Sequence, residues 1–131
     1  MNKLFDERYY IDRLKEEYAT YGKLIIGFDF DSTLFDLYDS GIDVTPIKDL
    51  VKRCTRHNFH TCLWTAVMDE WAIVYKKRII KDMGLEFTHY NESPALNDSR
   101  KPHFSILLDD RAGLESAYNI LVKTMDELNL K

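Results

Sequence analysis

The sequence lacks three features that would each point to a particular class of protein. It has two cysteines, Cys54 and Cys62, whose spacing fits neither a disulfide scaffold nor a metal site. No apolar run approaches the roughly 18 residues of a membrane span, and residues 1–8 carry charges where a signal segment would be apolar. The formal net charge is −4, so there is no general attraction to nucleic acid or to an anionic membrane. We therefore expect a soluble, cytoplasmic protein whose two thiols are reduced and buried in the core.

The composition is sufficient for one packed core. The chain has 131 residues, of which 45% are hydrophobic and 13% aromatic, and this predicts a single domain over residues 1–131. Two basic clusters stand out, at residues 76–78 and 100–101. We expect the first, Lys76-Lys77-Arg78, to lie on a solvated helix face.

Helical and strand patterns alternate along the chain. Apolar residues three to five apart, among them Phe5, Tyr9, Leu14, Tyr18 and Tyr21, predict an amphipathic helix that Gly22 ends. The other predicted helices start at Thr45-Pro46, cover about residues 69–83 with an apolar stripe of Trp71, Val74, Ile79 and Met83, and cover about 111–128. Short apolar runs predict strands at about 24–28, 59–64, 87–90 and 104–108, and residues 91–103 have the composition of a loop.

This alternation predicts an α/β fold with a mostly parallel sheet. Right-handed crossovers bring the carboxyl ends of parallel strands to one edge, where such folds bind their ligands. The residues after the predicted strands should therefore meet: Asp29 and Asp31 after the first, Thr65 after the second, and Asp109 and Asp110 after the last, with Lys101 just before that last strand.

So many carboxylates at one edge indicate a bound cation. A single aspartate at a strand end usually caps the next helix, but capping alone would rarely produce this whole set. Two carboxylates about 4 Å apart repel by roughly 4 kcal/mol at an effective dielectric constant near 20, unless a cation lies between them. Oxygen ligands without histidine or cysteine favour a hard ion, and Mg²⁺ fits best.

The first of these strand ends resembles motif I of the haloacid dehalogenase (HAD) superfamily. The segment Ile25-Ile26-Gly27-Phe28-Asp29-Phe30-Asp31-Ser32-Thr33-Leu34 matches the pattern of a hydrophobic strand followed by DxDxT. Leu63-Trp64-Thr65 resembles motif II, Lys101 the motif III lysine, and Leu107-Leu108-Asp109-Asp110 the acidic motif IV. The resemblance covers residues 24–128 and leaves the first helix, within residues 1–22, outside. It implies a Rossmann-like, three-layer α/β/α sandwich.

The resemblance also implies a reaction. Asp29 would attack phosphorus and form an aspartyl-phosphate that water hydrolyses, with Asp31 as general acid and then general base. Thr65 would donate a hydrogen bond to the phosphoryl group, and Lys101 would offset its charge. Mg²⁺ would be held by Asp29, the Asp31 carbonyl and Asp110, with Asp109 in support.

Substrate contacts are less closely specified by the resemblance. It places Thr33, Phe35, Ala66, Asn91 and Arg100 near the substrate, and residues 34–41 at the position of a short flap on which Phe35 or Tyr38 could cover the site or simply pack. Ser32 replaces a frequent glycine, which the loop should tolerate, and Val67 replaces a frequent arginine. Residues 32–64 and 66–100 are filled by the predicted elements, so the chain resembles capless members, including phage and bacterial ones without an assigned substrate.

Three functions stay open from the sequence. The first is a Mg²⁺-dependent phosphomonoesterase acting on a small metabolite or nucleotide. The second is a phosphatase for polynucleotide 3′ or 5′ ends, or an enzyme resembling a 5′(3′)-deoxyribonucleotidase, which an open site favours and the net acidity does not. The third is a non-catalytic scaffold that binds metal and phosphate. The sequence indicates neither an oligomeric state nor a membrane partner.

Overall fold

The computed structural model describes residues 2–66, 69–92 and 103–131. These residues form an α/β fold around a four-stranded parallel sheet with the strand order β3-β2-β1-β4. The strands are β1 (Ile25–Phe28), β2 (His60–Leu63), β3 (His89–Tyr90) and β4 (Ile106–Leu108). The helices are α1 (Glu7–Tyr21), α2 (Thr45–Arg56), α3 (Glu70–Asp82) and α4 (Leu114–Glu127), and a short 3₁₀ turn, η1 (Lys3–Phe5), precedes α1. The predicted α/β class and the parallel sheet are confirmed.

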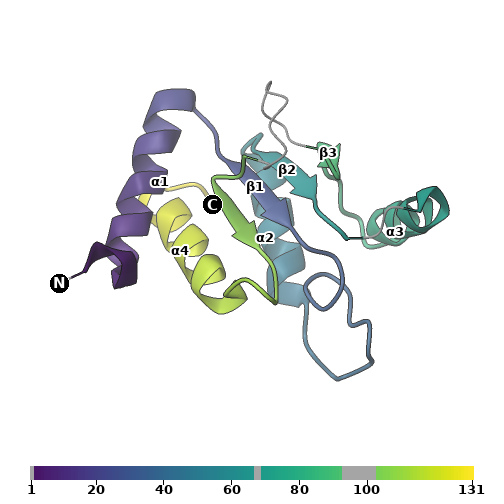
Figure 1. The fold of residues 1–131 in the computed structure, drawn as a ribbon. Helices are drawn as coiled ribbons and strands as arrows, with labels where there is room; N and C mark the ends of the chain where they lie inside the picture. Colours follow the sequence, from purple (N-terminus) through teal and green to yellow (C-terminus); the bar gives the residue numbers. More distant parts are fainter. Residues whose placement is uncertain (1, 67–68, 93–102) are drawn as a thin grey trace.

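The strands run in one direction and end at a shared edge, which we call the carboxyl edge (Figure 1). The central strand β1 pairs Phe28 with Leu63 of β2 on one side and with Leu108 of β4 on the other. The residues that follow these three partners therefore lie side by side. Between Asp31 and Thr65 the chain forms the loop before α2, α2 itself, a short turn and β2.

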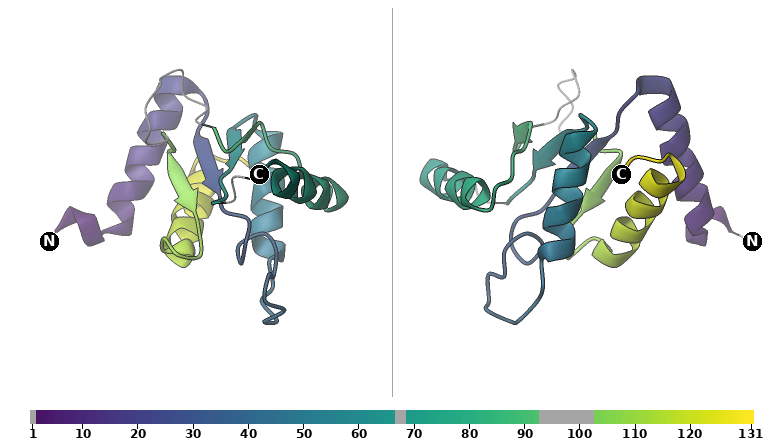
Figure 2. Two further views of the ribbon diagram at one scale, coloured as in Figure 1. Left: turned by 45° about the vertical axis from the view of Figure 1, so that its right-hand side comes forward. Right: turned by 180° about the vertical axis from the view of Figure 1, so that it is seen from behind.

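The hydrophobic core lies between the sheet and helices α2 and α4, which are on the same side of the sheet (Figure 2). Ile26 and Phe28 point into this core, because alternate residues of a strand share a face. The predicted inner face of α2 is confirmed, since Ile47, Leu50, Val51 and Cys54 are all buried. Both cysteines are buried and unpaired, as predicted.

Gly27 points to the opposite face, and its lack of a side chain is required there. A Cβ atom at this position would lie 2.9 Å from the ring of Phe104 and 3.0 Å from Leu107. Trp64 packs edge-on against Phe104, with 5.7 Å between the ring centroids. Phe104 thus fills the space over the central strand.

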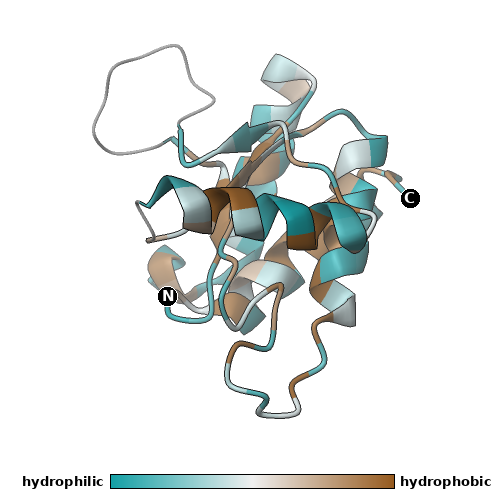
Figure 3. Cartoon of the chain, turned by 90° about the vertical axis from the view of Figure 1, so that its right-hand side faces the viewer, coloured by the Kyte–Doolittle hydropathy of each residue, from teal (hydrophilic) through white to brown (hydrophobic). Residues whose placement is uncertain are grey.

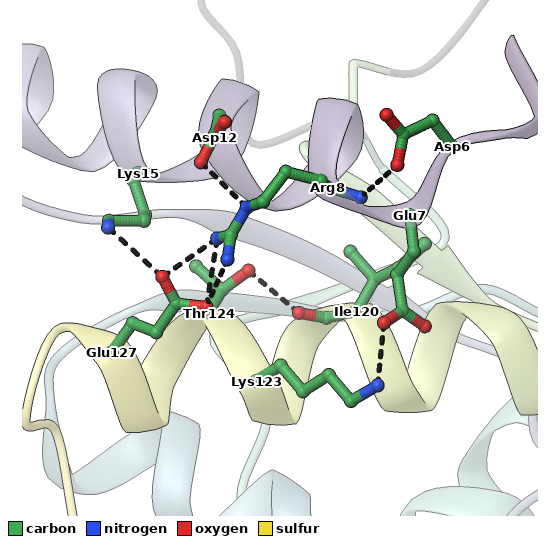
Figure 4. A network of polar contacts seen from close by, with 9 residues as sticks. All are labelled: Asp6, Glu7, Arg8, Asp12, Lys15, Ile120, Lys123, Thr124 and Glu127. Carbon is green, nitrogen blue, oxygen red and sulfur yellow. Dashed lines mark hydrogen bonds and ion pairs between the residues drawn. The ribbon is translucent and has the colours of Figure 1, made fainter. Parts of the chain in front are cut away.

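Helix α1 packs on α4 through a few buried residues and a band of ion pairs (Figure 4). Ile11 and Leu14 are its buried residues, and Leu14 belongs to the same hydrophobic cluster as the sheet. At the surface, Arg8 donates two hydrogen bonds to Glu127, at 2.7 and 2.8 Å from Nη2, and a third from Nη1 at 2.9 Å. Lys123 pairs with Glu7 at 2.6 Å. The first helix is therefore attached to the same core.

Two predicted helix faces are wrong in detail. In the predicted first helix, Phe5, which lies in η1, and Tyr21, which ends α1, are exposed, and Ile11 is buried instead. In α3, the buried residues are Ala72, Lys76 and Ile80, whereas Trp71 and Val74 of the predicted stripe face solvent. Figure 3 shows hydrophobic residues on the outer side of α3. Both helices carry enough apolar residues for two faces, so periodicity alone did not select the buried one.

Lys76 corrects a further prediction. Instead of lying on a solvated face, it is buried, while Lys77 and Arg78 are exposed as expected. Its position one turn from Ala72 and one turn from Ile80 places it on the inner face of α3.

No described helix is long and apolar enough to cross a membrane.

Candidate active site

Three carboxylates meet at the carboxyl edge. Asp29 follows β1, and Asp109 and Asp110 follow β4, so the pairing of Phe28 with Leu108 brings them together. The Asp29 backbone N–H donates to the Leu108 carbonyl at 2.9 Å and continues this pairing beyond the strands. One oxygen of each of the three carboxylates lies within 4.8 Å of the others. Such a group of oxygens suits a hard divalent cation.

The local environment strongly perturbs Asp29. Burial, a hydrogen bond with Asp110 and the charge of Asp109 together raise the pKa of Asp29 to about 7, with burial contributing most. The backbone N–H of Phe30 acts in the opposite direction. Without a cation, one proton is therefore retained at Asp29 close to neutral pH. A bound cation would favour the charged form and release that proton.

Thr33 connects the two acidic strand ends. Its buried hydroxyl donates to Asp29 Oδ2 at 3.3 Å and accepts the backbone N–H of Asp110 at 3.2 Å. The turn before it is fixed by the Phe30 carbonyl, which accepts from the backbone N–H groups of residues 33, 34 and 35. Ser32 in this turn has φ of 61°, the left-handed region that glycine adopts without strain. Thr33 thus positions the carboxylates and does not line the cavity beside them.

Asp31 belongs to a second polar group, centred on Lys76. The Lys76 ammonium donates to Asp31 Oδ2 at 3.2 Å and to Thr65 Oγ1 at 2.8 Å, and it lies 5.0 Å from the centre of the Phe30 ring. The side chain of Lys76 is 9% exposed and that of Asp31 is 36% exposed. A buried lysine is costly unless it is paired, so this contact fixes α3 against the carboxyl edge.

Thr65 is fixed from its other side by Asn91. The backbone N–H of Thr65 donates to the Asn91 side-chain oxygen at 2.8 Å, and Asn91 has φ of 50° just after β3. Asn91 therefore supports the end of β2.

A cavity of about 430 Å³ opens over the carboxylates. We call it the carboxylate cavity, and its lining residues are Asp29, Asp31, Ser32, Leu37, Tyr38, Trp64, Ala66, Asp109, Asp110 and Arg111. A larger cavity, of about 660 Å³, lies along β4 and α4 and is lined mainly by apolar residues. The carboxylate cavity, although smaller, is the better candidate for a functional site, because the titratable groups gather there.

The residues selected from the sequence differ in their placement. Asp29, Asp31, Asp109, Asp110 and Ala66 line the carboxylate cavity, and Thr65 is in contact with Lys76 beside it. Phe35 lies elsewhere: its ring stacks on Phe30 with 5.6 Å between centroids. Lys101 and Arg100 lie outside the described residues.

Two cations at the site were missed by the sequence analysis. Lys76 was expected at the surface because it begins a basic run; its spacing puts it on one face with Ala72 and Ile80, but the sequence did not show that this face is the buried one. Arg111, which lines the cavity, directly follows the acidic pair, and its position next to Asp110 was the available signal. Within the described part of the chain, Arg111 forms no ion pair.

No known family model, curated protein or solved structure matches this chain.

Proposed function

We propose that this protein is a Mg²⁺-dependent phosphomonoesterase that uses Asp29 as its nucleophile. The observation that carries the proposal is the meeting of Asp29 with Asp109 and Asp110 in a cavity that Asp31 also lines. A lone aspartate at a strand end would be a helix cap. Three carboxylates around one point, in a cavity shared with an aspartate that pairs with a buried lysine, have the composition of a site for a cation and a phosphate.

The metal would be held by Asp29 and Asp110, with Asp109 in support and with the Asp31 carbonyl as a further ligand. All of the side-chain donors are oxygens, which fits Mg²⁺ and argues against softer ions. When bound, Mg²⁺ supplies positive charge to the carboxylates and to the phosphoryl oxygens.

The reaction would proceed in two displacements. An Asp29 oxygen forms a bond to phosphorus, and the bond from phosphorus to the leaving oxygen breaks as Asp31 transfers a proton to that oxygen. Asp31 then accepts a proton from water, which attacks the same phosphorus. The products of this second step are inorganic phosphate and the regenerated Asp29 carboxylate.

Lys76 would hold two of the reacting side chains, Asp31 and Thr65, in position. By holding one oxygen of Asp31, it leaves the other free to face the cavity, and by holding Thr65 it fixes a hydroxyl beside the phosphoryl position. Such preorganised donors stabilise charge that develops in a transition state. Lys101, the sequence-based candidate for the charge-neutralising lysine, stays part of the proposal as an expectation from the HAD resemblance.

The resemblance to capless HAD phosphatases supports the same reaction and implies a three-layer sandwich, while the cytoplasmic location stays an expectation from the sequence. Motif I, the threonine after β2 and the paired aspartates after β4 all occur at the carboxyl edge. Dehalogenases lack the second aspartate of motif I, so Asp31 favours phosphate chemistry.

The test is phosphate release from a panel of phosphate esters with and without Mg²⁺. We expect Mg²⁺-dependent release that Asp29→Asn abolishes and that Asp49→Asn, an exposed aspartate on α2, leaves unchanged. Release from a phosphorylated oligonucleotide exceeding that from small esters would favour the polynucleotide-end alternative. The proposal fails if no ester is hydrolysed, or if Asp29→Asn retains the activity.

A further inference from the structure

The carboxylate cavity has an apolar side as well as an acidic one. Besides the charged groups it is lined by Leu37, Tyr38 and Trp64. Tyr38 is 74% exposed and Leu37 46% exposed, which is high for large apolar side chains next to a polar site. A ring that is neither packed nor buried in the free protein is available to a ligand.

The loop that carries Tyr38 is held in shape. Residues 34–41 form the flap loop, and within it the Asp36 carboxylate accepts the backbone N–H groups of Ser40 at 3.0 Å and Gly41 at 2.9 Å, and the Ser40 hydroxyl at 2.8 Å. These hydrogen bonds lower the pKa of Asp36, and the bond from the Ser40 backbone N–H contributes most. The flap loop therefore presents Tyr38 with little ordering left to be done on binding.

Trp64 is held in place by contacts with Phe104 and with β1. Its ring meets Phe104 edge-on, and its backbone N–H donates to the Phe28 carbonyl at 2.8 Å. Trp64 follows β2 directly, so it stands beside the carboxylates at the carboxyl edge. The two aromatic rings thus come from separate, individually anchored segments.

The remaining lining determines which leaving groups fit. Among the described lining residues, Ser32 and the polar tips of the two rings are the uncharged hydrogen-bonding side chains. The hydroxyls of a sugar or polyol leaving group would depend mainly on the charged side chains that the metal and the phosphate also need, and each hydroxyl that is buried without a partner carries a penalty. A flat aromatic ring needs few partners and gains from stacking.

We propose that the substrate is a nucleoside monophosphate, whose base lies against Tyr38 and Trp64 while its phosphate lies over Asp29. This inference rests on the proposed phosphatase function and names its substrate class. A cavity of about 430 Å³ is within the roughly 300–1,000 Å³ of sites that enclose a small molecule, so a free nucleotide is favoured over a phosphorylated side chain of a protein. Arg111, at the same cavity, offers a guanidinium to the phosphate.

A matched pair of substrates isolates the contribution of the base to kcat/KM. Adenosine 5′-monophosphate and ribose 5-phosphate place the same phosphate on the same sugar position, and only the first carries a base. We expect kcat/KM to be at least about tenfold higher for the nucleotide, the size of one stacking contact. Equal values for the two, or a higher value for a phosphotyrosine peptide than for the nucleotide, would overturn the inference.

Two tyrosine variants test where the base lies. Tyr38→Ala should reduce the preference for the nucleotide about tenfold, mainly through KM, and Tyr38→Phe should keep most of it, because stacking uses the ring. Tyr21→Ala is the matched control: Tyr21 is 72% exposed, close to the 74% of Tyr38, but it ends α1, just before β1 begins. An equal loss in Tyr21→Ala, or no loss in Tyr38→Ala, would contradict the assignment.

A binding measurement that needs no hydrolysis tests the nucleotide site separately from the proposed phosphatase activity. In an Asp29→Asn, Trp71→Phe variant, Trp64 is the single tryptophan; because it lines the larger cavity too, a fluorescence change is assigned to the carboxylate cavity only if adding Tyr38→Ala weakens it. We expect the nucleotide to change this fluorescence at concentrations at least about tenfold lower than ribose 5-phosphate does. If wild type hydrolyses no ester but this difference is found, the phosphatase proposal fails and the nucleotide site stands. If esters are hydrolysed and the difference is missing, the nucleotide site fails alone.

Discussion

Asp29 and Lys76 belong to two separate polar groups of the site. Asp29 is surrounded by acidic neighbours, which raise its pKa, whereas Lys76 is buried between Asp31 and Thr65. Each group has an electrostatic cost that the other does not offset, because no ion pair joins Asp29 to Lys76 among the described residues. The acidic group has the composition of a metal site, and the lysine fixes Asp31, the proposed general acid.

Replacing Lys76 tests the second group. Lys76→Met should lower kcat about a hundredfold, because Asp31 and Thr65 lose the donor that orients them. Asp31 is partly exposed, so the loss of stability should be moderate, about 1–2 kcal/mol. Lys76→Arg should recover part of kcat, and Lys81→Met, an exposed lysine on the same helix, should change neither quantity. Steady-state kinetics and urea unfolding measure both, and an unchanged kcat in Lys76→Met would remove Lys76 from the proposed site.

The raised pKa of Asp29 predicts how stability depends on pH. The ordinary carboxyl value is 3.8 and the folded value about 7, so the folded state binds more protons between these limits. The stability of the metal-free protein should therefore fall as pH rises through this range. Mg²⁺ should reduce the fall, because it favours the charged carboxylates.

Asp109→Asn should weaken this dependence, because it removes one of the charges that raise the pKa of Asp29. In EDTA at pH 8 we expect its Tm to be roughly 2–4 °C above wild type, with a smaller rise on addition of Mg²⁺. Thermal unfolding from pH 5 to pH 8 measures this, with Asp49→Asn as the control. A Tm below that of wild type in EDTA would show that repulsion does not dominate the cluster.

At the scale of elements, two helices have different attachments to the sheet. Helix α3 reaches the site through Lys76 and the core through Ile80, and its outer side exposes Trp71, Val74 and Tyr75. Helix α1 contacts α4 by a narrow apolar contact and by the ion pairs of Figure 4. Apolar burial and surface ion pairs contribute very different amounts to stability.

Helix α1 allows these two contributions to be compared directly. Leu14→Ala should destabilise the protein by about 3 kcal/mol, because Leu14 is 1% exposed and belongs to the main core. Arg8→Ala should cost much less, since Arg8 and Glu127 are exposed, and this small loss should shrink further in high salt. Urea unfolding at two salt concentrations gives both values. A larger loss for Arg8→Ala than for Leu14→Ala would mean that the ion pairs hold α1 in place.

At the scale of the whole molecule, residues from β1, β2, α3 and β4 converge on one edge of the sheet. A ligand bound there joins segments that are distant in the chain, so it should stabilise the entire fold. The effect requires that the ligand contacts the native arrangement alone.

Beryllium fluoride with Mg²⁺ is the probe for this coupling, because it mimics a phosphoryl group on an aspartate. We expect the two together to stabilise the protein by about 2–3 kcal/mol at a concentration about a hundredfold above Kd. Neither component alone should reach this value, and Asp29→Asn should abolish the joint effect. Thermal unfolding with each component separately and together measures it, and stabilisation that persists in Asp29→Asn would place the probe elsewhere.

The sequence by itself determined the elements and the acidic side of the site. Short apolar runs ending in Asp29, Thr65 and Asp109 predicted both the strands and their shared edge, because parallel strands in such folds end together. The inner face of α2 was also predictable, since its apolar residues form one stripe. These features are local, and neighbouring residues specify them.

Only the tertiary structure decided which faces are buried and which cations join the site. Helix α3 carries apolar residues on two sides, and the burial of one side accompanies the contact of Lys76 with Thr65 and with Asp31, which is 45 residues away in the chain. Tyr38 and Phe35 likewise diverge, one into the cavity and one onto Phe30, although they are close in sequence. Burial of a charge or a ring depends on long-range partners, and local periodicity carries no information about those partners.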